Sequence, residues 1–309
     1  MYSSPLLLAS LGVCLTLSSR SAAHNRGLMI PSGVHYEQDI VYSSPAGGKT
    51  LLLDVARPAV GKGPHPTVVL IPGGGWLSRG RKFKVPFQLE LASHGYVAVS
   101  IDYRWNPESP FPSQIHDAKK ALRWLKENAA HFGIDPSRLA AVGYSAGGNV
   151  ASLLGLTRPD DGLEPDRNDP SGSPGLSLVV SCHGISDFAT LYDKHCLAEP
   201  STLARRYVRL VLDTFLGGPP ERCAEMYRRA SAISYVHKGA PPTLLIHGTD
   251  DPVIPPSQSR LLRDRLQKEG VKVQLEEVKG GGHEFIGPQE KAANKMILQF
   301  LDQHLKPRR

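Results

Sequence analysis

The sequence is poor in the features that mark several classes of protein. It has only 4 cysteines in 309 residues, and no two of them are spaced as CxxC, so a paired-thiol redox or metal motif is excluded. No apolar run reaches the ~20 residues that a membrane-spanning helix needs. The 30 glycines and 26 prolines follow no three-residue period, which excludes collagen. With 40% hydrophobic residues, the chain is expected to fold as a globular protein.

The basic excess is small and scattered. Lysine and arginine number 36 against 29 acidic residues, which gives a net charge of +7. A protein that binds nucleic acid usually concentrates such charge on one face or in one run, whereas here basic and acidic residues are interleaved. The densest basic stretches, Arg79 to Lys84 and Lys306 to Arg309, are interpreted as solvated surface. No nucleic-acid partner is therefore expected.

Residues 1–23 differ from the rest of the chain. Pro5 to Leu17 is apolar and rich in leucine, and the small-residue stretch Ser21-Ala22-Ala23 follows it, of the kind that signal peptidase accepts. This pattern predicts a secretory signal peptide and a secreted or periplasmic protein. The apolar run is not preceded by lysine or arginine, so a disordered or weakly anchored tail is the alternative.

Cleavage of such a signal would leave three cysteines, because Cys14 would be removed with it. At most one disulfide could then form within the chain. Cys196 and Cys223 lie in a loop-rich stretch and are the candidates for a pair in an exported protein. The alternative is that Cys182, Cys196 and Cys223 are buried thiols, since a domain of this size needs no crosslink.

From about residue 34 onward, short apolar runs alternate with stretches of helical period. Most of these runs are continuously apolar, which is typical of parallel strands covered on both faces. They are Thr67 to Ile71, Tyr96 to Ile101, Leu139 to Val142, Leu176 to Ser181, Thr243 to Ile246 and Val271 to Val278. Val34 to Tyr42 and Thr50 to Ala56 alternate instead, which predicts an antiparallel hairpin at the sheet edge.

The intervening stretches are expected to be helices that cover the sheet. Ser113 is a candidate N-cap, and the apolar period that follows it leaves Lys119, Lys120 and Arg123 for the solvent face. Residues 34–309 are therefore predicted to form one three-layer α/β domain. Residues 187–235 hold no strand candidate and are expected to form a small helical cap inserted above the carboxyl ends of the strands.

A candidate nucleophile lies between a predicted strand and a predicted helix. Gly143-Tyr144-Ser145-Ala146-Gly147 matches GxSxG, and it follows the strand that ends at Val142. In that context a tight turn forces the central serine into a strained, exposed conformation, and the small neighbours relieve the crowding. A glycine-rich turn before a helix is the alternative. Tyr144, next to the serine, is a candidate substrate contact.

A serine hydroxyl needs a base to remove its proton and an acid to orient that base. His283 follows the strand that ends at Val278, after three glycines that allow its loop to approach closely. Asp251 follows the strand that ends at Ile246 and is favoured over its neighbour Asp250, since only one of them can meet the imidazole. His247, the rival base, is interpreted as a core histidine.

Acyl transfer also needs donors for the developing oxyanion. Pro72-Gly73-Gly74-Gly75-Trp76 follows an early strand, and its glycines leave backbone amides unobstructed. We expect the amides of Gly74, Gly75 and Ala146 to form the oxyanion hole. A simple turn or an anion-binding nest is the alternative, but the loop lacks the lysine and hydroxyl residue of a P-loop and does not match GxGxxG.

These motifs together resemble the α/β-hydrolase family, in the esterase and lipase branch marked by an HGGGW loop. The resemblance runs from about Tyr36 to Leu305, and it includes the order Ser, Asp, His of the catalytic residues, Asp102-Tyr103-Arg104 and Phe132-Gly133-Ile134-Asp135-Pro136. The chain looks most similar to bacterial exported esterases of the feruloyl and acetylxylan group. In this family the first loop position is usually histidine, which is thought to brace the loop, whereas here Pro72 would do so through its fixed φ.

Several residues around the motifs have two interpretations. Asp102 and Arg104 are expected to form a structural ion pair or hydrogen-bond anchor. Trp76 is a candidate wall of the acyl pocket, although it could be simple packing. His183, at the end of a predicted strand, is a candidate substrate contact in the cleft.

The resemblance implies a serine carboxylic-ester hydrolase that uses no cofactor and no metal. The expected substrates are small acyl, feruloyl or acetyl esters, free or linked to plant polysaccharides. An amide or formamide hydrolase is an alternative because the same triad serves both bonds, and a peptidase of this fold is another. A non-catalytic binding protein is less compatible with the sequence, because Ser145, Asp251 and His283 are all present.

Overall fold

The computed structural model describes residues 29–45, 48–61, 63–78, 80–166, 175–198 and 202–306. The predicted signal peptide, residues 1–23, lies outside these ranges. Within them, no helix combines the length and apolar character that crossing a membrane would require.

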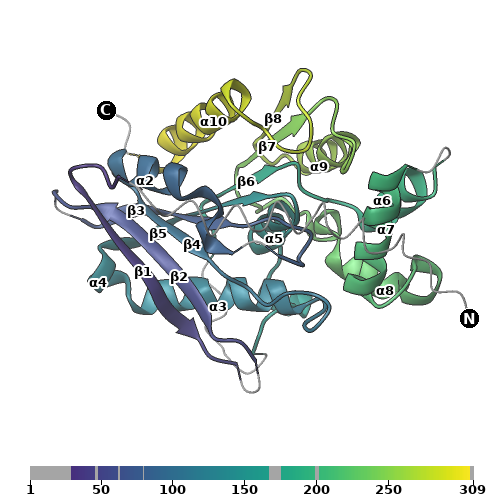
Figure 1. The fold of residues 1–309 in the computed structure, drawn as a ribbon, viewed down its shortest axis with the longest axis horizontal. Coiled ribbons are helices and arrows are strands. Elements are labelled where there is room, and N and C mark those ends of the chain that lie inside the picture. The colour runs from purple at the N-terminus through teal and green to yellow at the C-terminus, as the bar shows by residue number, and fades with distance from the viewer. Residues whose placement is uncertain are drawn as a thin grey trace, which may run out of the picture.

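An eight-stranded sheet, in the order β1-β2-β4-β3-β5-β6-β7-β8, forms the centre of the molecule (Figure 1). β1 and β2 form the predicted antiparallel hairpin, and β2 also pairs antiparallel with β4. All the remaining neighbours are parallel. The strands are β1 (Val34–Ser43), β2 (Leu51–Pro58), β3 (His65–Ile71), β4 (Val97–Ile101), β5 (Ile134–Tyr144), β6 (Leu178–Cys182), β7 (Thr243–Gly248) and β8 (Val273–Val278).

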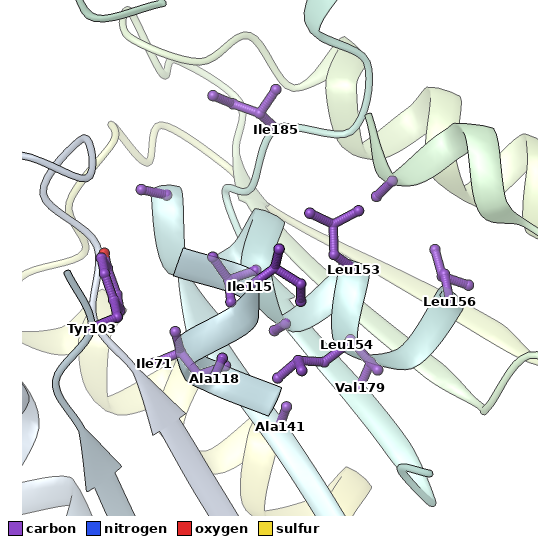
Figure 2. Packing of buried hydrophobic residues seen from close by; sticks show 14 of the residues in the cluster. Ile71, Tyr103, Ile115, Ala118, Ala141, Leu153, Leu154, Leu156, Val179 and Ile185 are labelled. Atoms are coloured by element: carbon purple, nitrogen blue, oxygen red, sulfur yellow. The ribbon is translucent and has the colours of Figure 1, made fainter. Parts of the chain in front are cut away.

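Successive residues of the central strands are buried on opposite faces of the sheet. In β3, Val69 packs in one apolar cluster while Val68 and Leu70 pack in the other. Helices α3 (Ser113–Glu127), α5 (Ala146–Leu156) and α9 (Ser257–Lys268) cover the first face, whose packing against α3 and α5 is shown in Figure 2. Helices α2 (Val85–Ser93) and α10 (Pro288–Leu305) cover the second. Two covered faces explain why these strands are continuously apolar.

Between β6 and β7, the described residues form a series of helical segments. Figure 1 shows α6, α7 and α8 together at one end of the molecule, away from the β1 and β2 hairpin. The segments are α6 (Phe188–Leu191), the π-helical turn η3 (Tyr192–Cys196), α7 (Leu203–Leu216), α8 (Pro220–Ala230) and the short 3-10 turn η4 (Ala232–Tyr235). We refer to residues 187–235 as the cap segment. Its α7 is amphipathic, with Val208, Val211, Leu212, Phe215 and Leu216 buried.

Two local predictions about helices were wrong. Ser113 is the first residue of α3, and Pro112 occupies the capping position without a side-chain hydrogen bond. Helix α2 was not predicted, and it follows the short 3-10 turn η1 (Arg81–Lys84). Apolar and polar residues of α2 are both buried, including Gln88, which donates to the carbonyls of Asp54 and Ala98. Because apolar and polar residues do not alternate with a helical period in Val85–Ser93, no helix was predicted for this segment.

Part of the basic stretch from Arg79 to Lys84 is buried, not solvated as predicted. Arg81 is 8% exposed, and its guanidinium lies 2.7 Å from Asp54 and 2.6 Å from Asp102 and also contacts Asp39. Asp102 has the predicted structural role, as an ion-pair partner and hydrogen-bond acceptor, but its partner is Arg81 and not Arg104. The cluster ties η1 to the edge of the sheet.

Two other basic side chains also have buried partners. Arg104 forms its ion pair with Asp117, at 2.8 Å. Lys119 was assigned to the solvent face of α3, but it is 1% exposed and pairs with Glu164, which also binds Arg123 at 2.7 Å. A lysine can occupy such a position only because a carboxylate from elsewhere in the chain neutralises it.

We expect Arg81→Met to destabilise the fold by about 3 to 5 kcal/mol, because Asp54 and Asp102 would remain buried without a counter-charge. Arg57→Met is the matched control, since its pair with Glu37 at 3.0 Å has side chains 30% and 40% exposed. Its cost should be about 0 to 1 kcal/mol. Urea unfolding followed by circular dichroism measures both; equal costs would show that the cluster at Arg81 is not a stability element.

The predicted disulfide is not formed. Cys182, Cys196 and Cys223 are all free thiols. Burial raises the pKa of Cys182 and of Cys196 to about 12, so both remain protonated at neutral pH. The alternative of three thiols is the one that the structure shows, although Cys223 is only partly buried.

Candidate active site

Ser145 occupies the turn between the end of β5 and the first residue of α5. Its φ of +54° is unusual for a non-glycine residue and marks a strained turn. The glycines on either side are required by close backbone contacts. A Cβ at Gly143 would lie 2.0 Å from the carbonyl oxygen of Gly147, and one at Gly147 would lie 2.2 Å from that of Ile71. The turn therefore holds the serine side chain at the carboxyl end of the sheet.

Ser145, His283 and Asp251 are joined by hydrogen bonds, although their loops are distant in sequence. The Nε2 atom of His283 lies 2.9 Å from the Oγ of Ser145, and its Nδ1 lies 2.7 Å from an Oδ atom of Asp251. A carboxylate can only accept, so Nδ1 carries the proton and Nε2 is left to accept from the serine hydroxyl. This is the tautomer that general-base chemistry requires.

Asp251 is held as a carboxylate in a buried position. Burial alone would raise the pKa of Asp251, but hydrogen bonds from His247 and His283 hold it well below its usual range. The second Oδ atom accepts from the amides of Val253 and Ile254, both at 2.9 Å. The charge needed to orient the imidazole is therefore available across the neutral pH range.

The two rivals of the predicted residues take other positions. Asp250 is exposed and accepts from the hydroxyl of Thr249 at 2.8 Å. His247 is fully buried, with Nδ1 2.7 Å from the hydroxyl of Ser259 and Nε2 2.9 Å from the carbonyl of Ile254. It anchors the loop that carries Asp251 and does not contact the serine.

The loops that carry Asp251 and His283 are bound to each other. The amide of Asp250 donates to the carbonyl of Gly281 at 2.9 Å, and the amide of Gly280 donates to the hydroxyl of Thr249 at 2.9 Å. A Cβ at Gly248 would lie 2.2 Å from the carbonyl oxygen of Gly281, so only glycine permits this approach. The acid and the base are thus positioned as one unit.

The glycine loop after β3 lies beside the serine. Gly74 and Gly75 have φ of +92° and +61°, and neither amide donates to an acceptor within the residues that the structure describes. Gly73 lies close to the serine, since a Cβ on Gly73 would be 3.2 Å from the Cβ of Ser145. A Cβ on Gly75 would instead lie near the hydroxyl of Tyr207 on α7. Gly73 was not singled out from the sequence. The unpaired amides leave donors for an oxyanion.

Tyr103 braces this loop, whose first position is Pro72 instead of the histidine expected from the resemblance. Its hydroxyl is 2.8 Å from the carbonyl of Pro72 and 3.2 Å from that of Gly73. The tyrosine is 2% exposed and follows β4. A hydrogen bond from a neighbouring strand therefore supports the loop in addition to the fixed φ of proline.

A small cavity, lined by both polar and aromatic side chains, adjoins the serine. Its walls include Tyr144, His183, Phe285 and the ion pair between Lys84 and Glu290. The hydroxyl of Tyr144 and the Nδ1 of His183 are buried in this wall and have no hydrogen-bond partner among the described residues. Lys84 and Glu290 were not found from the sequence, because they lie on segments that no motif connects.

His183 lies directly against the candidate base. Its ring centroid is 4.7 Å from that of His283, it is 4% exposed, and its φ of +43° is strained. Burial, reinforced by the neighbouring His283 and His247, holds the pKa of His183 well below its ordinary value. His183 is therefore a neutral ring that can exchange a hydrogen bond with a group in the cavity.

Trp76 has a packing role. Its ring is 1% exposed and stacks on Phe215 of α7 with centroids 3.9 Å apart. It also lies against Phe188 of α6, at 5.7 Å. The side chain joins the glycine loop to the cap segment and is not among the walls of the cavity beside Ser145.

Among the described residues, no three histidine, cysteine or carboxylate side chains gather closely enough to hold a metal ion. The polar groups at Ser145 are those of a site that works through proton transfer and hydrogen bonding.

A mostly parallel sheet with a serine at its strand-to-helix turn, followed in order by the acid and the base, defines the α/β-hydrolase fold. The model of the BD-FAE family matches residues 53–266. The chain belongs to this family of α/β-hydrolase esterases.

Curated relatives and solved structures agree with this assignment. The chain is 31% identical to Esterase LipQ of Mycobacterium tuberculosis, over 80% of this chain and 56% of LipQ. It is 35% identical to Esterase LipC of the same organism, over 76% of this chain and 57% of LipC. The chain thus spans just over half the length of these relatives. A thermophilic esterase of Thermogutta terrifontis, Est2 with butyrate bound, superposes with a TM-score of 0.71 at 25% identity, over 90% of this chain and 97% of that one.

Proposed function

We propose that the protein is a serine carboxylesterase in which Ser145 is the nucleophile, His283 the general base and Asp251 the residue that orients it. The observation that carries the proposal is the unbroken hydrogen-bond chain from Asp251 through both nitrogens of His283 to the Ser145 hydroxyl. Esterase relatives and a family of esterases support the same reaction class.

The geometry supports a two-step acyl transfer. Nε2 of His283 takes the serine proton as Oγ attacks the ester carbonyl, and the resulting imidazolium is stabilised by Asp251. The amides of Ala146, Gly74 and Gly75 are the proposed donors to the oxyanion. His283 then gives its proton to the leaving alcohol, and water repeats the sequence to release the acid and regenerate Ser145.

We propose small, polar esters as substrates, with acetyl and feruloyl esters, free or linked to plant polysaccharides, as the specific candidates. The unpartnered hydroxyl of Tyr144 and the neutral ring of His183 favour a group that can hydrogen-bond, and they disfavour a long alkyl chain. Est2, a structural neighbour, has butyrate bound, which supports a short acyl group.

We also propose that the protein is exported, on the basis of the apolar run and the small-residue stretch within residues 1–23.

A fluorophosphonate probe and a substrate panel test this function. The probe should add to Ser145, as located by peptide mass spectrometry, and p-nitrophenyl acetate should be cleaved with a kcat/KM at least about tenfold above that of the octanoate ester, a difference of about 1.4 kcal/mol. An acetanilide in the same panel separates ester from amide cleavage. An unlabelled Ser145 in folded protein would favour a binding protein over an enzyme.

A further inference from the structure

A second cavity, of about 350 Å³, lies between the cap segment and the start of α9. Its walls come from α6 and η3 on one side and from Pro255, Ser257 and Gln258 on the other. None of its lining residues is shared with the cavity beside Ser145. It is therefore a separate hollow with its own chemistry.

The lining of this second cavity is basic. Lys194, His195 and Arg205 all line it, and no carboxylate does so among the described residues. Arg205 donates a hydrogen bond of 3.3 Å to the carbonyl of Ala198. Burial and the positive charge of Arg205 lower the pKa of His195, so this ring is neutral and can donate or accept one hydrogen bond at each nitrogen. Three cationic or proton-donating side chains around one hollow are the arrangement that proteins use for carboxylates and phosphates.

The first turn of α9 adds to this positive field. The helix has 12 residues, and its first turn carries no acidic side chain and no side-chain cap. Its amino end faces the cavity through Pro255, Ser257 and Gln258. The helix dipole at such an end favours an anion.

One buried side chain in the cavity wall has a polar atom without a hydrogen-bond partner among the described residues. His195 is 8% exposed, and its Nε2 has no hydrogen-bond partner among the described residues. Gln258 is 1% exposed, and its Oε1 accepts from the amides of Ser186 and Asp187 at 3.0 and 2.8 Å. These two bonds fix the Gln258 side chain, so Nε2 of His195 is the unpartnered atom in this wall. Buried polar atoms of this kind usually have a bound partner.

We propose that this cavity binds a small molecule through an oxyanion, either a carboxylate or a phosphate, with Lys194 and Arg205 as the charged contacts and the His195 ring as a hydrogen-bonding contact. The site adjoins the loop that carries Asp251. Pro255 lines the cavity, and the neighbouring Ile254 and Val253 donate their amides to Asp251. The proposal concerns binding and stands whether or not the protein cleaves esters.

Isothermal titration calorimetry of the purified protein with inorganic phosphate, citrate and chloride, at matched ionic strength, tests the proposal. We expect saturable binding of phosphate or citrate, a rise in Tm with the same ligand and no saturable binding of chloride. Tighter binding of phosphate than of citrate would assign the natural ligand to phosphates, and the reverse order would assign it to carboxylates.

Lys194→Gln should weaken that binding about tenfold, which corresponds to loss of one charge-assisted contact. Lys194 is exposed, so the variant should fold normally. Lys268→Gln is the matched control, because it removes the same charge from an exposed position at the other end of α9 and should leave the affinity unchanged. Absence of saturable oxyanion binding in the wild type, or an equal loss in the two variants, would overturn the proposal.

Discussion

Ser145→Ala should lower kcat for ester hydrolysis by about six orders of magnitude, as removal of a nucleophile that acts in concert with its base does elsewhere. The serine hydroxyl lies 2.9 Å from Nε2 of His283, and the variant that lacks it cannot form the acyl-enzyme. Hydrolysis of p-nitrophenyl acetate measures the loss, and circular dichroism establishes that the variant is folded.

Ser152→Ala is the matched control for the nucleophile. Ser152 lies on the same helix, α5, is buried, and donates its hydroxyl to the carbonyl of Gly148 at 2.8 Å. It makes no contact with His283, so activity should stay within about threefold of the wild type, since the substitution removes one local hydrogen bond of modest net energy. Substantial turnover by pure, folded Ser145→Ala would contradict the proposed mechanism.

Asp251→Asn should lower kcat by about four orders of magnitude while leaving the fold intact. The side-chain amide is close in size to the carboxylate, but it carries no charge to stabilise the imidazolium. Its amino group can also reverse the tautomer of His283, so that Nε2 no longer accepts the serine proton. Steady-state kinetics on an acetyl ester report the loss.

Asp250→Asn separates the role of Asp251 from a general effect of charge in this loop. Asp250 is the adjacent residue, is exposed, and its carboxylate accepts from the hydroxyl of Thr249 at 2.8 Å. We expect a change in kcat below about threefold, because an exposed carboxylate in high dielectric acts weakly on the site. If Asp250→Asn were as damaging as Asp251→Asn, the assignment of the acid would be wrong.

The sheet was predictable because its signal is local. Continuous apolar runs mark strands that are buried on both faces, and the α/β architecture predicted from them is confirmed. β5 extends further than predicted, from Ile134 to Tyr144. The stretch from Asp135 to Arg138 is not apolar, and this first part of the strand pairs with β3 only at Ile134, opposite His65. Whether the first residues of a strand pair depends on the neighbouring strand, which is distant in the sequence and so does not enter a local pattern.

Buried charges were not predictable from the same patterns. Lys119 is separated from Glu164 by 45 residues, and Arg81 is separated from Asp54 by 27 and from Asp102 by 21. Periodicity reports on the polarity of each residue alone, so it assigns a lysine or an arginine to the surface. Only the folded chain brings the compensating carboxylate to it.

The candidate site divides in the same way. Ser145, Asp251 and His283 each stand in a short motif after a strand, so their juxtaposition follows from the fold. The cavity walls do not, because Lys84 comes from η1 and Glu290 from α10, and only tertiary packing pairs them. Trp76 was ambiguous in the sequence, since a tryptophan beside a loop serves equally as a pocket wall or as packing against the cap segment.

The close backbone contacts at Gly143, Gly147 and Gly248 limit how this protein can diversify. A side chain at any of the three would collide with main-chain atoms, at 2.0 to 2.2 Å, that no rotamer change can move aside. Natural or laboratory selection for a new ester substrate must therefore keep these three glycines. Heritable change in substrate choice has to accumulate in the surrounding side chains, at positions such as His183 and Lys84.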